Sequence, residues 1–141
     1  MNIQIIKEKN TDNRMLIGSD FVEGMNTGEL NLARIILENQ DEIPILNEYP
    51  YLLAIEYLMY PPYSQFGKGD LLFYDGGYRL LVVELKSLNN RCGSTARVSR
   101  HKARRKVEEQ AYRYSQLMQE KYPQFSVRGI SFTNEDLRQY L

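Results

Sequence analysis

Residues 67–88 read GKGDLLFYDGGYRLLVVELKSL. Two apolar runs, at residues 69–74 and 78–88, flank the segment 75–77 (Asp-Gly-Gly), and a turn of this composition between apolar runs is a strong hairpin signal. The second run is almost wholly apolar through Val83, which is typical of a central strand that is buried on both faces. The stretch therefore predicts two antiparallel strands near the middle of a sheet.

Further elements are predicted on the N-terminal side of this hairpin. A helix is expected over residues 27–39, with Thr27 as its N-cap. Residues 52–59 are largely apolar and predict a strand, with a helix as the alternative. The isoleucines within residues 3–6 indicate a short strand, and residues 11–13 (Thr-Asp-Asn) indicate a turn.

On the C-terminal side, a long helix is predicted over residues 100–121, followed by a last strand over residues 125–132. The inward stripe of this helix comprises Ala103, Val107, Ala111, Tyr114 and Met118. The order αβββαβ predicts an α/β (α+β) fold with a central mixed four-stranded sheet flanked by helices. The helix between the third and fourth strands makes those two strands parallel.

The composition fits one globular domain over residues 1–141, with its core at about residues 27–132. Of the chain, 43% is hydrophobic and 26% charged, and no apolar run approaches the roughly 20 residues that span a bilayer. The start shows no secretion signal, and the single cysteine, Cys92, fits a reducing compartment. We therefore expect an intracellular protein, in the cytoplasm or nucleus, with no membrane partner.

Glu84 and Lys86 interrupt the end of the apolar strand, and residues two apart on a strand project from the same face. A three-residue loop at 75–77 places Asp70 opposite Val82 and diagonal to Glu84, on that same face. Two carboxylates that converge there suit Mg²⁺ or Mn²⁺, with a main-chain carbonyl and water completing the coordination. The metal interpretation therefore predicts the three-residue loop.

Asp70, thirteen intervening residues and the tripeptide 84–86 (Glu-Leu-Lys) resemble the D…(D/E)xK signature of the PD-(D/E)XK nuclease superfamily, although no proline precedes Asp70. Residues 110–114 (QAYRY) are similar to the QxxxY motif of its RecB-like and lambda-exonuclease-like branch. The resemblance covers about residues 27–132. It implies a restriction-endonuclease-like core and a phosphodiesterase that depends on Mg²⁺ or Mn²⁺.

The chemistry of the side chains assigns roles to individual residues of the strand end. Asp70 and Glu84 would bind the cation, with Leu85 contributing its main-chain carbonyl. The cation would polarise a phosphoryl oxygen and lower the pKa of bound water. Lys86 would position or deprotonate the attacking water and offset developing negative charge.

Three more residues are candidates for the catalytic site. Gln110 and Tyr114 share one face of the predicted helix, and the resemblance implies that they hold the active site or the DNA backbone; Tyr114 is equally a core aromatic with a polar tip. The superfamily often adds a carboxylate from the first helix, and Glu29 is the predicted one because it points inward. The alternative is that Glu29 is only a favourable acid in a first helical turn. The competing carboxylates are Glu23, Glu48 and Glu56.

Seven arginines and lysines lie between residues 91 and 106 without any acid, on a chain whose net charge is zero. Such a segment is typical of a local patch for a polyanion, and a solvated loop and helix start is the alternative. The predicted nucleic-acid contacts are Arg91, Arg97, Arg100, Lys102, Arg104 and Arg105.

These features together predict a metal-dependent nuclease, with DNA favoured over RNA and with endo or exo action undecided. The alternative is a non-catalytic nucleic-acid-binding module on the same fold. A third hypothesis is a structural or interaction protein in which Glu84 and Lys86 form a solvated salt bridge at a strand end. A homodimer or a partner protein would be the source of selectivity in so short a chain.

Overall fold

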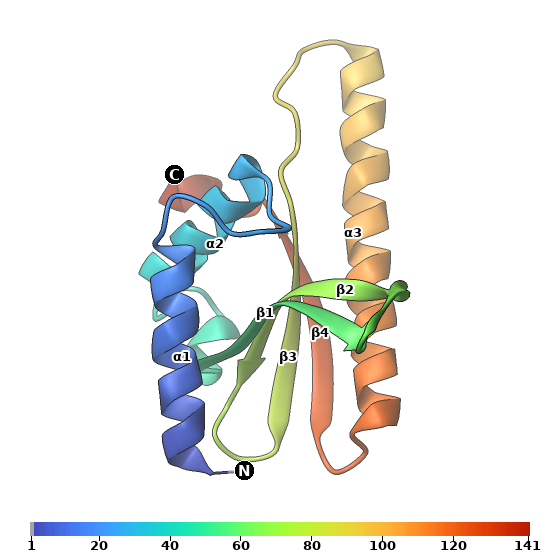
Figure 1. The fold of residues 1–141 in the computed structure, drawn as a ribbon. Helices are drawn as coiled ribbons and strands as arrows, with labels where there is room; N and C mark the ends of the chain where they lie inside the picture. The colour runs from blue at the N-terminus through green and yellow to red at the C-terminus, as the bar shows by residue number, and fades with distance from the viewer. Residues whose placement is uncertain (1) are drawn as a thin grey trace.

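The computed structural model describes residues 2–141, and for residues 60 and 63–66 it describes the main chain only. The helices are α1 (Ile3–Ile17), α2 (Thr27–Glu38) and α3 (Ser94–Lys121), and the strands are β1 (Tyr51–Tyr60), β2 (Tyr63–Tyr74), β3 (Arg79–Lys86) and β4 (Ser126–Thr133). Short 3₁₀ turns occupy Leu46–Glu48 and Arg138–Tyr140. The strands form one sheet in the order β1-β2-β3-β4, with β1/β2 and β2/β3 antiparallel and β3/β4 parallel (Figure 1). The predicted α+β class, with a mixed four-stranded sheet flanked by helices, is confirmed.

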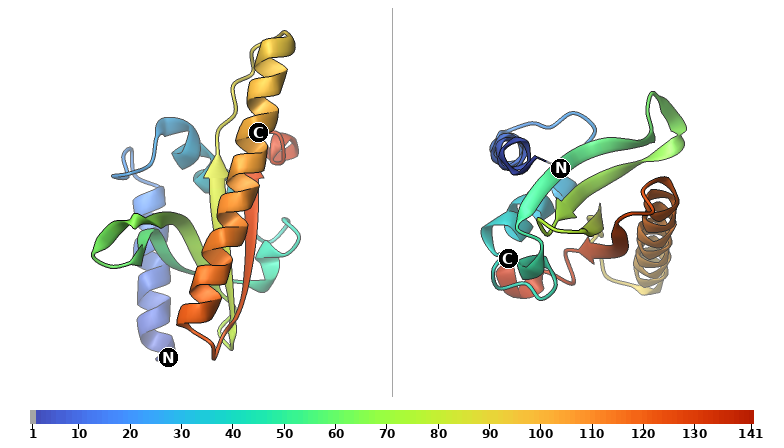
Figure 2. Two further views of the ribbon diagram at one scale, coloured as in Figure 1. Left: turned by 90° about the vertical axis from the view of Figure 1, so that its right-hand side faces the viewer. Right: turned by 90° about the horizontal axis from the view of Figure 1, so that it is seen from below.

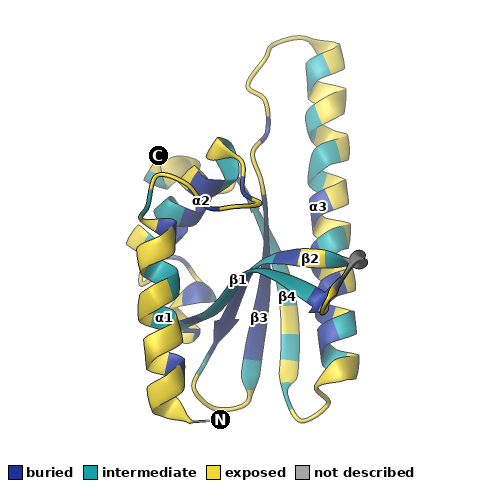
Figure 3. Ribbon diagram, viewed as in Figure 1, coloured by how far each residue is buried: buried dark blue, intermediate teal, exposed yellow. Residues whose placement is uncertain are grey.

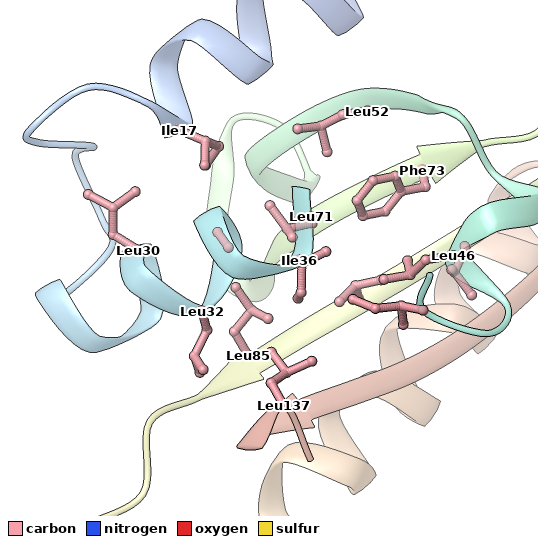
Figure 4. Packing of buried hydrophobic residues seen from close by; sticks show 14 of the residues in the cluster. Ile17, Leu30, Leu32, Ile36, Leu46, Leu52, Leu71, Phe73, Leu85 and Leu137 are labelled. Atoms are coloured by element: carbon pink, nitrogen blue, oxygen red, sulfur yellow. The ribbon is translucent and has the colours of Figure 1, made fainter. Parts of the chain in front are cut away.

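Strand β3 is the centre of the fold because both of its faces are covered. Leu81 and Val83 belong to the apolar cluster on the α2 side, whereas Leu80 and Val82 belong to the cluster on the α3 side. This is the alternation of a strand, and it sets α2 and α3 on opposite faces of the sheet (Figures 1 and 2). Figure 4 shows Ile36 of α2 packed among the side chains of the first cluster. Each fully buried aliphatic side chain of this kind contributes about 1.5–3 kcal/mol to folding.

Helix α1 corrects the interpretation of the N-terminal segment as a strand followed by a turn. The helix begins after Asn2, whose side chain caps it. The Asn10 side chain accepts a hydrogen bond from the Leu52 N–H at 2.8 Å, and the Asn13 side chain donates to the Leu52 carbonyl at 2.9 Å. These asparagines therefore bind the open edge of β1 instead of their own turn. Local sequence patterns carry no information about such a distant partner.

Helix α3 begins at Ser94, earlier than the predicted start near residue 100. Val107 is its first buried residue, so the opening turns have no apolar stripe that would reveal them. Together with the preceding loop they project beyond the sheet and are mostly exposed (Figure 3); we refer to residues 89–102 as the arm. Although α3 has 28 residues, none of the described helices is long and apolar enough to cross a membrane.

The hairpin of β2 and β3 is confirmed, but its register differs from the prediction by two residues. The structure pairs Leu72 with Val82, where the prediction had placed Asp70. A shift of two residues leaves every side chain on its predicted face, whereas a shift of one would reverse the faces. Continuing the observed pairing brings Asp70 directly opposite Glu84 instead of diagonal to it.

The turn explains this shift. The Asp75 N–H donates to the Arg79 carbonyl at 3.1 Å, so the tip comprises residues 76–78 and not the predicted 75–77. The Asp75 carboxylate accepts hydrogen bonds from two main-chain N–H groups of the turn, at 2.8 and 3.0 Å, which is a common role of aspartate at the start of a turn. Gly76 has a φ of +93°, a conformation that glycine adopts without steric cost.

Gly129 of β4 marks a close approach between the sheet and α3. A Cβ at this position would overlap the Ala111 carbonyl oxygen and lie 2.9 Å from the Ser115 Cβ. We expect Gly129→Ala to lower the free energy of unfolding by about 1–3 kcal/mol, because the helix must move away from the strand. Chemical denaturation measures the change. Gly77→Ala, where a Cβ meets only the Asp75 side chain at 3.6 Å or more, is the control, and an equal loss in both variants would contradict the close approach.

Candidate active site

The carboxylates of Asp70 and Glu84 each accept a hydrogen bond from a main-chain N–H of the opposite strand. The Asp70 N–H donates to Glu84 Oε2 at 2.8 Å, and the Leu85 N–H donates to Asp70 Oδ2 at 2.7 Å. The two carboxylates therefore lie on one face, as the metal interpretation requires, just beyond the last regular pair of β2 and β3. A carboxylate has about four acceptor sites, so these hydrogen bonds leave capacity for a further ligand.

Two more carboxylates join this pair from α2 and β1. Oxygen atoms of Glu29, Glu56 and Asp70 lie within 4.8 Å of one another. Glu29 is in the first turn of α2, and its N–H donates to the Asn26 side chain at 2.8 Å. Asn26 is therefore the N-cap of α2, and the prediction of Thr27 was wrong by one residue. The predicted position of Glu29 beside Asp70 agrees with the structure.

Glu56 is the acid that the sequence analysis held only as a competitor. Its φ of +45° lies in the left-handed region, which costs a residue with a side chain roughly 1–2 kcal/mol. Its Oε1 is buried and has no hydrogen-bond partner among the described residues, while Oε2 lies 3.4 Å from Lys68 Nζ. A strained backbone and an unpartnered buried oxygen both favour a functional role. The feature of the sequence that could have singled out Glu56 is that it is the one acidic residue within the apolar run 52–59.

A cavity of about 420 Å³ joins these carboxylates to cationic side chains. Lys68 and the predicted Lys86 line it from the sheet, and Lys106 lines it from α3. Leu85 also borders the cavity, and its side chain packs in the apolar cluster on the α2 side of the sheet. Lys106 belongs to the basic segment of the sequence, and its place in this cavity was not predicted.

Burial makes this a costly place for negative charge. Glu84 is only 2% exposed, and burial, followed by the neighbouring Asp70 carboxylate, raises its pKa above the ordinary value. Burial also raises the pKa of Asp70, against the effect of the hydrogen bond from Leu85, and raises that of Glu56, against the effect of Lys68. A divalent cation among the carboxylates would offset both the burial and the mutual repulsion.

The glycines that precede Asp70 make room for two tyrosine rings. A Cβ on Gly67, whose φ is +105°, would lie 2.6 Å from the Tyr114 ring, and a Cβ on Gly69 would overlap the Tyr57 ring. The Tyr57 hydroxyl is buried without a hydrogen-bond partner among the described residues. Its pKa is raised well above the ordinary value by burial and then by the Glu84 carboxylate. No local signal in the sequence marks Tyr57, because it lies within an apolar run.

Gln110 and Tyr114 occupy the face of α3 that the resemblance implies, but they differ in what they contact. Gln110 lines the cavity, and its Nε2 lies 3.5 Å from the Tyr114 hydroxyl, at the outer limit of a hydrogen bond. Tyr114 is 4% exposed and belongs to the core between the sheet and α3. Of the two, Gln110 is therefore the residue that reaches the cavity.

The six predicted nucleic-acid contacts do not gather beside the carboxylates. Three of them, Arg91, Arg97 and Arg100, line a separate cavity; Arg104 forms an ion pair with Glu135; and Lys102 and Arg105 are exposed on α3. Arg97 and Lys106 are nine positions apart, about two and a half helical turns, so they lie on opposite sides of α3. The expectation of one basic patch next to the carboxylates is therefore wrong, because the segment is helical over most of its length.

The donor set fits Mg²⁺ or Mn²⁺. Hard carboxylate oxygens are the ligands these ions prefer, and the described cluster offers them from three different elements. Glu56 Oε1, which has no hydrogen-bond partner among the described residues, would gain a partner in a bound cation, and the cation would offset the burial that raises the carboxyl pKa values. Glu56 thus becomes a candidate ligand beside the predicted Glu29 and Asp70, and Glu84 lies next to this cluster, where it accepts a hydrogen bond from the Asp70 N–H.

Comparisons with protein-family profiles, with curated proteins and with solved structures find no significant match to this chain. A functional conclusion therefore depends on the geometry and the chemistry of the site.

Proposed function

We propose that this chain is a Mg²⁺- or Mn²⁺-dependent nuclease of the PD-(D/E)XK type, with a restriction-endonuclease-like core, and that it hydrolyses phosphodiester bonds of DNA. The observation that carries the proposal is the meeting of Asp70 and Glu84 across one hairpin, with Lys86 bordering the same cavity. The element order from α2 to β4 and the parallel pair β3/β4 agree with what the resemblance implies.

Each residue of the site has a part in this chemistry. Glu29, Glu56 and Asp70 would hold the cation, which supplies Lewis-acid polarisation of a phosphoryl oxygen. Glu84 accepts the hydrogen bond from the Asp70 N–H and so fixes the position of Asp70. The Lys86 ammonium holds the attacking water and offsets the negative charge that grows on the phosphate.

A polyanion can enter a cavity lined by carboxylates only if cationic groups stand beside them. Lys86 from β3 and Lys106 from α3 provide such groups on two walls of the cavity. Lys68 contributes less to phosphate binding, because its ammonium pairs with Glu56. We therefore place the scissile phosphodiester between β3 and α3.

Lys86→Ala tests this assignment. We expect the purified wild-type protein to cleave DNA in millimolar Mg²⁺ or Mn²⁺ and to stop when the cation is chelated. The variant should be slower by about 10²-fold, because it lacks the group that positions the water, while its affinity for Mn²⁺ changes little. Cleavage of a labelled duplex and calorimetric titration with Mn²⁺ measure the two quantities.

Lys9→Ala, at an exposed lysine of α1, is the matched control and should cleave as the wild type does. Undiminished cleavage by Lys86→Ala would remove Lys86 from the mechanism. If the wild type binds DNA in a salt-dependent manner but cleaves it with neither cation, the nuclease proposal is overturned in favour of a non-catalytic binding module.

A further inference from the structure

A second cavity, of about 520 Å³, lies against the flank of α3 that faces away from the carboxylates. Its walls come from three separate segments: the loop after β3, the first turns of α3 and the segment after β4. Its cationic lining consists of Arg91, Arg97, Arg100 and Arg138, which we refer to as the arginine pocket. Arg138 comes from the C-terminal segment, which the sequence analysis did not connect with the basic segment.

The positive charge of the arginine pocket is not cancelled by its surroundings. Glu135 is the acidic residue in the lining. Its Oε2 lies 2.9 Å from Nη1 of Arg104, which is outside the lining, and its Oε1 lies 3.9 Å from Arg100 Nε. No ion pair joins Arg91, Arg97 or Arg138 to any described residue. The pocket therefore keeps a positive charge that suits an anion.

Hydrogen bonds between the three walls fix the shape of the pocket. The Leu88 N–H donates to Asn134 Oδ1 at 2.7 Å, and Asn134 Nδ2 donates to the Leu88 carbonyl at 3.2 Å. Arg100 Nη1 donates to the Arg91 carbonyl at 2.5 Å and to Asn89 Oδ1 at 3.3 Å. These contacts join the base of the arm to the C-terminal segment. They hold the Arg100 side chain and the main chain of the three walls in place, so a ligand need not order these parts when it binds.

We propose that the arginine pocket binds a phosphate group, at a site separate from the carboxylate cavity. Guanidinium groups form paired hydrogen bonds with phosphate oxygens, and their planar geometry matches phosphate better than a lysine ammonium does. The asparagine side chains of the lining add neutral donors beside them. The ligand is a phosphate of a nucleic-acid strand that continues around α3 from the scissile bond. This last assignment, unlike phosphate binding itself, rests on the proposed nuclease function.

Binding in the presence of a chelator tests the pocket without cleavage. The probes are a labelled single-stranded oligonucleotide and inorganic pyrophosphate. Pyrophosphate represents a free phosphate compound, as opposed to a phosphate within a nucleic-acid strand. Arg97→Gln and Arg138→Gln should each weaken binding of the oligonucleotide by about tenfold or more, since a hydrogen bond to a charged group contributes about 1.5–3 kcal/mol. Arg113→Gln, at an exposed arginine further along α3, is the matched control and should bind within about twofold of the wild type.

Cys92 gives an independent readout, because the only cysteine of the chain is exposed and lines this same pocket. A bound probe should slow the alkylation of Cys92 by iodoacetamide in the wild type and in Arg113→Gln. The same probe concentration should give little protection in Arg138→Gln. This measurement locates the ligand, which an affinity alone does not.

The possible outcomes distinguish the proposal of a phosphate-binding pocket from the proposal of nuclease activity. Oligonucleotide binding that pyrophosphate displaces and that Arg97→Gln and Arg138→Gln lose supports a strand phosphate as the ligand. Pyrophosphate binding with the same losses, but without oligonucleotide binding, supports the phosphate pocket and overturns the nucleic-acid assignment. Equal binding by Arg97→Gln, Arg138→Gln and Arg113→Gln overturns the pocket. Failure of the nuclease proposal would instead appear as absent cleavage with Mg²⁺ or Mn²⁺ while pocket binding is intact.

Discussion

Glu84→Gln is expected to lower the rate of divalent-dependent DNA cleavage by about 10²–10³-fold, and also to stabilise the cation-free protein by about 1–3 kcal/mol at pH 8. The Glu84 side chain is almost fully buried, and its pKa is raised by burial and by Asp70. Glutamine keeps an oxygen that accepts the hydrogen bond from the Asp70 N–H but carries no charge. The variant therefore removes a source of instability together with one of the four carboxylate charges around the proposed cation.

Two measurements on the same preparation test this prediction. Cleavage of a labelled duplex in Mn²⁺ gives the loss of activity, and denaturant unfolding in a chelator gives the change in stability. Glu120→Gln, at an exposed position of α3, is the matched control and should alter neither quantity appreciably. A Glu84→Gln protein that is less stable than the wild type would show that Glu84 serves the fold, and one that is fully active would remove Glu84 from the site.

The cation-free protein is expected to lose stability as the pH rises from about 5 to 8, and Mn²⁺ is expected to restore it. Burial raises the pKa values of the Asp70–Glu84 pair in the folded state, whereas in the unfolded chain these carboxyls titrate near pH 4. Between those limits the folded protein holds a proton that the unfolded chain has released. The free energy of unfolding therefore falls by about 1.4 kcal/mol per pH unit for each carboxyl that stays protonated.

Bound Mn²⁺ requires the ionised carboxylates, so its stabilising effect should be larger at pH 8 than at pH 5.5. At a free concentration one hundred times the dissociation constant, a ligand that binds only the folded state adds about 2.7 kcal/mol. Thermal unfolding at a series of pH values, with and without Mn²⁺, measures both effects. Glu84→Gln should have a shallower pH dependence than the wild type. Equal slopes in the two proteins, or no response to Mn²⁺ at pH 8, would contradict a metal site built on these carboxylates.

The hairpin was predictable because its signals are local. An apolar run of strand length on each side of Asp-Gly-Gly leaves few other folds for residues 67–88, and the polar residues Asp70, Glu84 and Lys86 stand out against that run. The register was not predictable to the residue, because it depends on how the Asp75 side chain binds the turn. The prediction that Asp70 and Glu84 share a face was still correct, because side-chain direction along a strand repeats every two residues and the register was shifted by two.

Other parts of the site depend on contacts that no local pattern contains. Helix α1 was misread because Asn10 and Asn13 bind the edge of β1, about 40 positions away. The sequence left Glu56 as one of several competing carboxylates, because its position beside Asp70 depends on its own left-handed backbone conformation and on the pairing of β1 with β2. The cationic side chains of the basic segment lie on two opposite sides of α3, because the helix already begins at Ser94 and includes most of the segment.

The sequence by itself determined the alternation of buried and polar side chains along the central strands, and so the presence of an acid–acid–amine group at the end of one hairpin. It also determined the element order from α2 to β4 and the parallel closing strand. Only the tertiary structure decided which other carboxylates meet that group and that the arginines of the arm face a different cavity. The physical reason is that side-chain direction within a strand follows a local steric rule. Distances between elements, in contrast, depend on how whole helices and strands pack around the core.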